Sequence, residues 1–97
     1  MMDAGIKVRV EWAPAKRVRL PKSSTYSTVA KFPEDVKWPS EAWSIVVSFD
    51  EGPAEGSSYS KGRARFLSAE GPYERLVTGK VFELFEGSER TATVLVL

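Results

Sequence analysis

The side chains that could do chemistry in this chain are carboxylates and cations, because its 97 residues include no Cys and no His. Without Cys there is no thiol nucleophile and no thiolate ligand for zinc. Without His there is no Ser-His-Asp arrangement and no side chain that ordinarily titrates near neutral pH. These absences exclude most enzyme mechanisms, so we predict no catalytic residue, no metal site and no cofactor.

Acid–base catalysis would therefore have to use carboxylates. The acids available for it all lie in predicted loops: Glu34, Asp35, Asp50, Glu51 and Glu55. Neighbouring acids in a sequence are weak evidence for catalysis, which needs a shaped pocket and carboxyl groups of different pKa. The segment 50–53 also lacks the spacing of a calcium-binding EF-hand loop. We expect neither catalysis nor metal binding from these acids.

Charge is segregated along the chain, although the formal net charge is only +1. Residues 1–31 hold seven Lys or Arg and two acids, a balance of +5. Residues 32–60 hold one Lys and six acids, a balance of −5. The small net charge therefore does not exclude a charged binding face, but any such face must be local.

The basic N-terminal third supplies most of the predicted binding residues, which are Arg9, Lys16, Arg17, Arg19 and Lys22. One interpretation is a basic patch for an acidic partner or for RNA. An RNA site also needs aromatic side chains among the cations, and Tyr26 alone lies nearby in the sequence. The other interpretation is that Lys and Arg occupy outward strand positions, where they maintain solubility and protect strand edges.

Arg63 and Arg65 form a second pair of cations on one face of a predicted strand. Together they could grip a phosphate or a carboxylate. The more ordinary interpretation places an acid opposite them on a neighbouring strand.

Trp38 is the aromatic residue with the most unusual surroundings, between Lys37 and Pro39 in a predicted loop. An exposed Trp in such a loop can be a hot spot for binding, and we include it among the predicted binding residues. It could equally close the open end of a small barrel.

Short strands must position these side chains, because apolar and polar residues alternate along much of the chain and no amphipathic helix is present. We predict strands at residues 6–12, 17–20, 25–32, 43–49, 63–68, 81–85 and 91–97. Residues 33–42 and 50–62 are predicted loops, and Gly87 marks a hairpin turn between the last two strands. Six or seven short strands indicate an all-β barrel or sandwich, with residues 1–97 as a single domain.

The C-terminal segment carries a resemblance to a known family. Residues 79–87 have the form G-x-x-F-x-L-x-E-G, and a run of small and apolar residues follows at 92–97. This segment resembles the last hairpin of the C-terminal (third) barrel domain of elongation factor Tu. The resemblance implies an all-β, six-stranded antiparallel, Greek-key-like barrel, similar to small bacterial proteins built from that domain alone. The 97 residues contain no G-x-x-x-x-G-K-[ST] loop, the phosphate-binding motif of a GTP-binding domain. The resemblance therefore does not imply GTP-dependent translation or tRNA binding.

The function predicted from these observations is a non-catalytic protein-interaction module that binds through a barrel face or through the loops 33–42 and 50–62. One alternative is an RNA-binding protein that uses the basic N-terminal third. Another is a small inhibitor or immunity protein whose acidic segment mimics a nucleic acid. Pairing of two copies through an edge strand is a further open alternative.

The predicted location is the cytoplasm, without membrane contact. No apolar stretch approaches the roughly 20 residues of a membrane helix. The first residues also lack the apolar region of a signal peptide.

Overall fold

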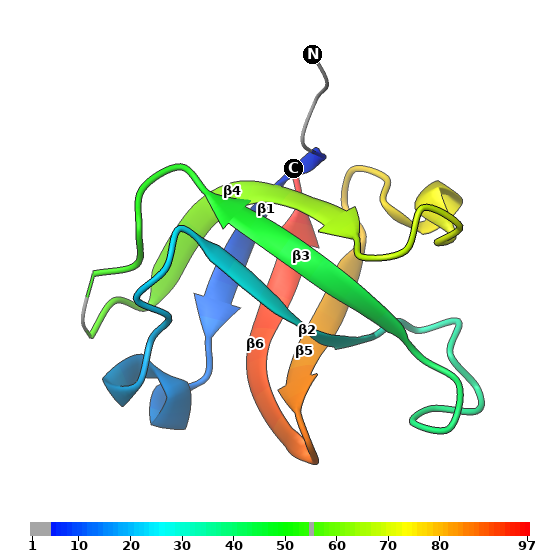
Figure 1. The fold of residues 1–97 in the computed structure, drawn as a ribbon, viewed down its shortest axis with the longest axis horizontal. Helices are drawn as coiled ribbons and strands as arrows, with labels where there is room; N and C mark the ends of the chain where they lie inside the picture. Colours follow the sequence, from blue (N-terminus) through cyan, green and yellow to red (C-terminus); the bar gives the residue numbers. More distant parts are fainter. Residues whose placement is uncertain (1–4, 55) are drawn as a thin grey trace.

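Six strands form a closed antiparallel barrel in the order β1-β4-β3-β2-β5-β6 (Figure 1). The structure is a computed structural model, and it describes residues 5–54 and 56–97. The strands are β1 (Ile6–Trp12), β2 (Thr25–Lys31), β3 (Trp43–Phe49), β4 (Tyr59–Phe66), β5 (Val81–Glu86) and β6 (Glu89–Val96). The all-β, six-stranded antiparallel barrel that the sequence predicts is confirmed.

The order of the strands is a Greek key followed by a hairpin. β2, β3 and β4 are neighbours in chain order, and the first strand, β1, lies beside β4 and not beside β2. The β5–β6 hairpin lies between β2 and β1, because β5 pairs with β2 and β6 pairs with β1. In the turn of this hairpin, Gly87 has a positive φ of 62°. Each described strand thus has two hydrogen-bonded neighbours, so pairing with a second copy through an edge strand would have to displace one of them.

The alternation of residues along β1 shows how the sequence produces the barrel wall. Val8, Val10 and Trp12 are fully buried, whereas Lys7 and Arg9 point to solvent. Period-two alternation places every second side chain on the same face of a strand, so one face of β1 enters the core. The other strands, and Phe32 directly after β2, add the remaining large core side chains, which include Phe32, Ile45, Val47, Phe66, Phe82, Leu84 and Val94.

The strand predicted at 17–20 is wrong, because Pro14–Val18 form a 3-10 helix, η1. Pro14 suits the first turn of a helix, and the Lys16 backbone N–H donates to the Ala13 carbonyl oxygen at 2.9 Å. A second 3-10 helix, η2, spans Tyr73–Arg75. Among the residues that the structure describes, no helix is long and apolar enough to span a lipid bilayer.

The loop predicted at 50–62 is too long, because β4 already begins at Tyr59. Ser60 and Gly62 are typical of turns in sequence, yet both are buried here. Ser60 accepts a hydrogen bond from the Trp12 indole N–H at 2.9 Å. Gly62 lies opposite Val8 on one side and Phe49 on the other, where β4 passes close to the backbone of β3.

We expect Gly62→Ala to destabilise the barrel. A Cβ at this position would collide with the Ser48 carbonyl oxygen and lie 2.9 Å from the Phe49 Cα. Backbone atoms cannot move aside as the end of a side chain can, so the cost should reach at least the ~1–3 kcal/mol of an overpacked core. Urea unfolding monitored by tryptophan fluorescence would measure it.

The matched control is Gly52→Ala, because nothing lies within 4 Å of a Cβ built at Gly52. Its unfolding midpoint should stay close to that of the unchanged protein. Equal midpoints for the two variants would contradict the close approach of β3 and β4 at Gly62.

Candidate functional site

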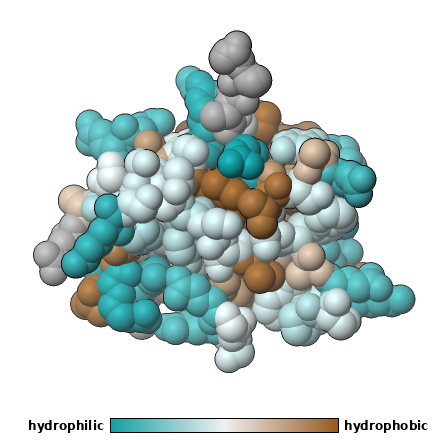
Figure 2. All heavy atoms as spheres, viewed as in Figure 1, coloured by the Kyte–Doolittle hydropathy of each residue, from teal (hydrophilic) through white to brown (hydrophobic). Residues whose placement is uncertain are grey.

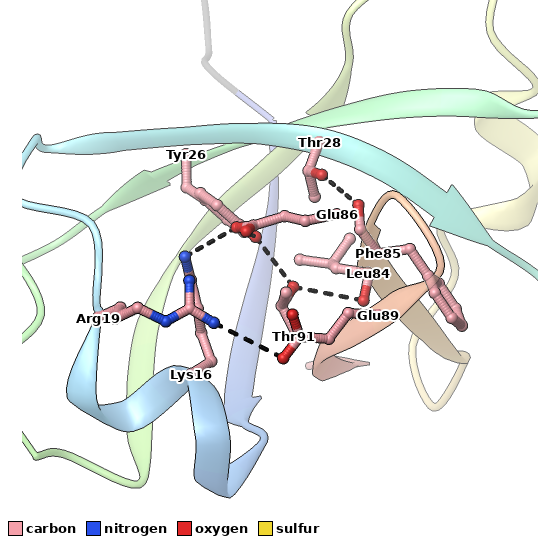
Figure 3. Close-up of polar contacts among 9 residues, drawn as sticks. All are labelled: Lys16, Arg19, Tyr26, Thr28, Leu84, Phe85, Glu86, Glu89 and Thr91. Carbon is pink, nitrogen blue, oxygen red and sulfur yellow. Dashed lines mark hydrogen bonds and ion pairs between the residues drawn. The ribbon is translucent and has the colours of Figure 1, made fainter.

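Lys16, one of the predicted binding residues, belongs to a buried polar cluster beside the β5–β6 hairpin (Figure 3). Its Nζ lies 2.8 Å from Glu86 Oε2, and its side chain is only 8% exposed. The Tyr26 hydroxyl donates to the same carboxylate oxygen at 2.6 Å and lies 2.9 Å from the Thr91 hydroxyl oxygen. No buried side-chain N or O atom of the described residues lacks a partner, so this cluster is internally satisfied.

The cluster lies where the backbone pairing of the barrel is shortest. β2 pairs with β5 only from Val29 to Lys31, opposite Phe85 to Glu83. Before Val29, side chains replace the ladder: the Thr28 hydroxyl donates to the Phe85 carbonyl oxygen, and Tyr26 reaches the β5–β6 hairpin. The cluster therefore joins η1 and β2 to the C-terminal hairpin and completes the barrel.

The pKa values of the cluster also favour a structural role. Burial raises the pKa of the Tyr26 hydroxyl, and its hydrogen bond to Glu86 raises it further. Desolvation raises the pKa of Glu86, but hydrogen bonds from Lys16 and Tyr26 outweigh it, so the net pKa is lowered. The phenol thus stays neutral and the carboxylate stays ionised near neutral pH, which makes the pair unsuited to proton transfer.

The other cations of the N-terminal third lie in different surroundings. Arg17 donates its Nε–H to the Trp12 carbonyl oxygen at 3.0 Å. Arg19 lies 3.6 Å from the carboxylate of Glu89, and Lys22 is exposed in the segment between η1 and β2. Arg9, in contrast, points outward from the middle of β1, so the structure does not gather the five predicted cations into one patch.

Trp38 is half-buried and packs over the β2–β5 ladder. Its indole N–H donates to the Ala30 carbonyl oxygen at 3.0 Å, and its ring lies 4.6 Å from that of Phe85. Lys31 Nζ lies 5.4 Å from the indole centroid. Trp38 therefore covers the shortest ladder of the barrel, a position that neither sequence interpretation specified.

A second set of cations, which shares only Arg9 with the predicted set, lies on the outward side of β1 and β4. We call this surface the cationic face. It consists of Lys7, Arg9, Lys61, Arg63 and Arg65. Lys7 lies directly opposite Arg63, and Arg9 lies directly opposite Lys61. Like charges in directly opposite positions repel each other and destabilise a sheet. The fold thus holds an arrangement that its own stability does not favour.

No described acid neutralises the cationic face by an ion pair within 4.0 Å. The cations that do have such an acid lie elsewhere, namely Lys16, Arg19, Arg75, Lys80 and Arg90. Glu11 is the one acid on the outward side of β1, and it lies opposite Tyr59.

The acid expected opposite Arg63 and Arg65 is absent, so that interpretation is wrong. Arg63 lies between Lys7 and Ser48, and Arg65 lies opposite Val46. The Arg63 guanidinium donates instead to the Gly5 carbonyl oxygen at 3.3 Å. The sequence does contain a signal for the cationic face, since cations recur at every second position in both strands. The sequence pattern does not indicate that β1 pairs with β4, and this pairing brings the two rows of cations together.

β3, the strand next to β4, carries no charged residue. On the face shown in Figure 2 the area over β3 is mostly pale, with a small hydrophobic patch, and hydrophilic residues lie around the rim. Ser44 and Ser48 face outward on β3, opposite Val29 and Thr25 of β2. The cationic face therefore ends at the boundary between β4 and β3.

The acids of the predicted loops do not form a catalytic or metal site in the described residues. Asp35 is ion-paired with Arg75 at 2.9 Å, and Glu34 is ion-paired with Lys80. Asp50 and Glu51 line a cavity of about 430 Å³ together with Tyr59 and Lys61. Residues 5–54 and 56–97 contain no cluster of three potential metal ligands, and Glu55 lies outside them.

No protein-family model, curated protein or solved structure matches the chain. The closed barrel agrees with the fold that the resemblance to the third domain of elongation factor Tu implies. The relationship to that family itself stays a prediction. The surface of the barrel is therefore the source of evidence for its function.

We expect the stability of the barrel to fall at acid pH in a way that depends on Glu86. Its pKa in the folded state is lowered, so its contribution is present above the ordinary Glu pKa of about 4.3 and is lost as pH falls through the folded value. Glu86→Gln should reduce stability at pH 7 and remove this part of the pH dependence. Urea midpoints measured between pH 7 and about pH 3 would detect both effects.

Glu51→Gln is the control, because Glu51 is exposed and has no ion pair among the described residues. It should keep the acid dependence of the unchanged protein. If Glu86→Gln also kept that dependence in full, the cluster would not close the barrel as described.

Proposed function

We propose that the protein is a non-catalytic protein-interaction module that binds an acidic surface of a partner protein on the cationic face. The observation that carries the proposal is the direct opposition of Lys7 with Arg63 and of Arg9 with Lys61, with no ion pair to an acid within 4.0 Å among the described residues.

Binding of carboxylates would relieve the repulsion between these cations. Each like-charged pair opposes folding by up to ~1 kcal/mol, and a carboxylate placed between its members converts this repulsion into attraction. The strands also fix the backbone positions of the cations before the partner arrives, which lowers the entropy that is lost on binding. Arg9, Arg63 and Arg65 can each hold a carboxylate through two parallel N–H groups.

The alternative of an inhibitor with an acidic, nucleic-acid-like surface has less support. Two acids of the 33–42 loop, Glu34 and Asp35, are neutralised by Lys80 and Arg75. Hydrogen bonding from Lys80 also lowers the pKa of Glu34, as expected for a carboxylate already engaged within the protein.

RNA is the second candidate ligand, and one observation favours it. The Arg9 guanidinium lies over the Tyr59 ring, 5.1 Å from its centroid, and Tyr59 is 52% exposed. An exposed aromatic ring beside cations can stack on a base. Tyr59 provides one such position beside Arg9, whereas the cationic face provides several positions for anions, so we favour an acidic protein.

We expect the double variant Arg9→Glu/Arg63→Glu to lose binding to an acidic probe. A fluorescent polyglutamate peptide should bind the unchanged protein in a salt-sensitive manner, and the variant should weaken this binding at least about tenfold. Fluorescence anisotropy at several salt concentrations would measure the affinity.

Lys22→Glu/Lys37→Glu is the matched control, since it makes the same change in net charge at exposed positions off β1 and β4. Its binding of polyglutamate should stay near that of the unchanged protein. An equal loss in both double variants would mean that net charge alone attracts the probe, and the proposal would then fail.

A further inference from the structure

An exposed apolar row borders the cationic face on the side of β5 and β6. Val81 of β5 lies directly opposite Leu95 of β6, and Leu95 lies directly opposite Arg9 of β1. Arg9 in turn lies opposite Lys61 of β4. One row across four neighbouring strands therefore reads apolar, apolar, cation, cation.

The adjacent row holds one apolar residue followed by two cations. Leu97 donates its backbone N–H to the Lys7 carbonyl oxygen at 3.0 Å, and Lys7 lies opposite Arg63. Val81 and Leu97 are each 46% exposed, and Leu95 is partly exposed between them. Single exposed apolar residues are ordinary on protein surfaces, but a group of them beside cations without acids is typical of a binding surface.

A polar row limits this surface along the strands. Two residues further along β1, Glu11 lies between Thr93 of β6 and Tyr59 of β4. Thr93 lies opposite Glu83 of β5, whose carboxylate is 4.0 Å from Arg90. The apolar and cationic residues thus lie together. Glu11 and Glu83 border them along the strands, and Asp50, directly after β3, borders Lys61, to whose carbonyl oxygen its backbone N–H donates at 2.9 Å.

We infer that the partner binds through an amphipathic acidic helix, whose apolar side chains pack on Val81 and Leu95 while its carboxylates contact Lys7 and Arg9 of the adjacent strand β1. This inference rests on the proposed function and adds the chemistry of the partner. Neighbouring strands lie 4.7–4.9 Å apart, so the part of the row from β5 through β6 to β1 is roughly 10 Å wide. That width accommodates one helix, which is about 10–12 Å in diameter with its side chains.

The apolar part of the row distinguishes this partner from others. A nucleic acid would satisfy the cations but would offer no aliphatic side chains to cover Val81 and Leu95. An anionic membrane would satisfy both, but it would also bring Glu11 and Glu83 in the next row close to its negative surface. An acidic helix has a limited width and can avoid that row.

The test compares two labelled peptides of equal length by fluorescence anisotropy. The first forms an amphipathic helix with a stripe of Leu flanked by Glu, and the second is polyglutamate. The unchanged protein should bind the first at least about tenfold more tightly. Val81→Ser/Leu95→Ser should reduce binding of the first peptide to the level of polyglutamate and leave polyglutamate binding unchanged.

Val36→Ser is the matched control, because Val36 is an aliphatic residue that is 89% exposed in the β2–β3 loop. It should bind both peptides as the unchanged protein does. Leu95→Thr, which introduces a β-branched residue suited to a strand, is a milder variant that should show a smaller loss in the same direction. Urea unfolding of each variant would verify that it folds.

The outcomes separate the two proposals. If polyglutamate binds in a salt-sensitive manner but the amphipathic peptide binds no better, the inference is overturned and the proposed function stands. If neither peptide binds, both are overturned. If oligouridylate or vesicles with phosphatidylserine bind more tightly than the amphipathic peptide, and Val81→Ser/Leu95→Ser weakens that binding, the helical partner is overturned in favour of that ligand.

Discussion

The side-chain cluster of Lys16, Tyr26 and Glu86 closes the barrel where its backbone pairing is too short. β2 and β5 share a ladder of only three residue pairs, and without the cluster both would offer unpaired edges at this point. The Tyr26 ring also lies 5.4 Å from that of Trp12, so the cluster is continuous with the core. This closure completes the ring of strands in which β1 lies between β4 and β6.

Ionic interactions in this protein divide into two groups with different consequences. The acids Asp35, Glu34 and Glu86 hold loops and η1 against the barrel through Arg75, Lys80 and Lys16. The cations of β1 and β4 are left without such acids among the described residues. A formal net charge of +1 therefore conceals one strongly positive surface, because most of the compensating negative charge is used inside the fold or in loops.

The parts that the sequence predicts well are those set by neighbouring residues. Alternation defines β1 at Ile6–Trp12 and β3 at Trp43–Phe49, and the hairpin at Gly87 is read from its turn. The parts that it misses depend on distant contacts. Lys16 belongs to η1 and not to a strand, with a partner 70 residues away at Glu86, roughly the length of a small domain. The cationic face exists only because β1 pairs with β4, and no local pattern reveals which strands will pair.

The position of β1 between β4 and β6 has a consequence for synthesis on the ribosome. β1 is the first strand to emerge, yet one of its neighbours, β6, is the last. One side of β1 must therefore stay unpaired until the last of the six barrel strands has been synthesised, and unpaired strands with apolar side chains promote aggregation. Lys7 and Arg9, spaced between the apolar residues of β1, are the kind of gatekeeper that opposes such association. The same cations can thus protect the nascent chain first and face a partner after the barrel has closed.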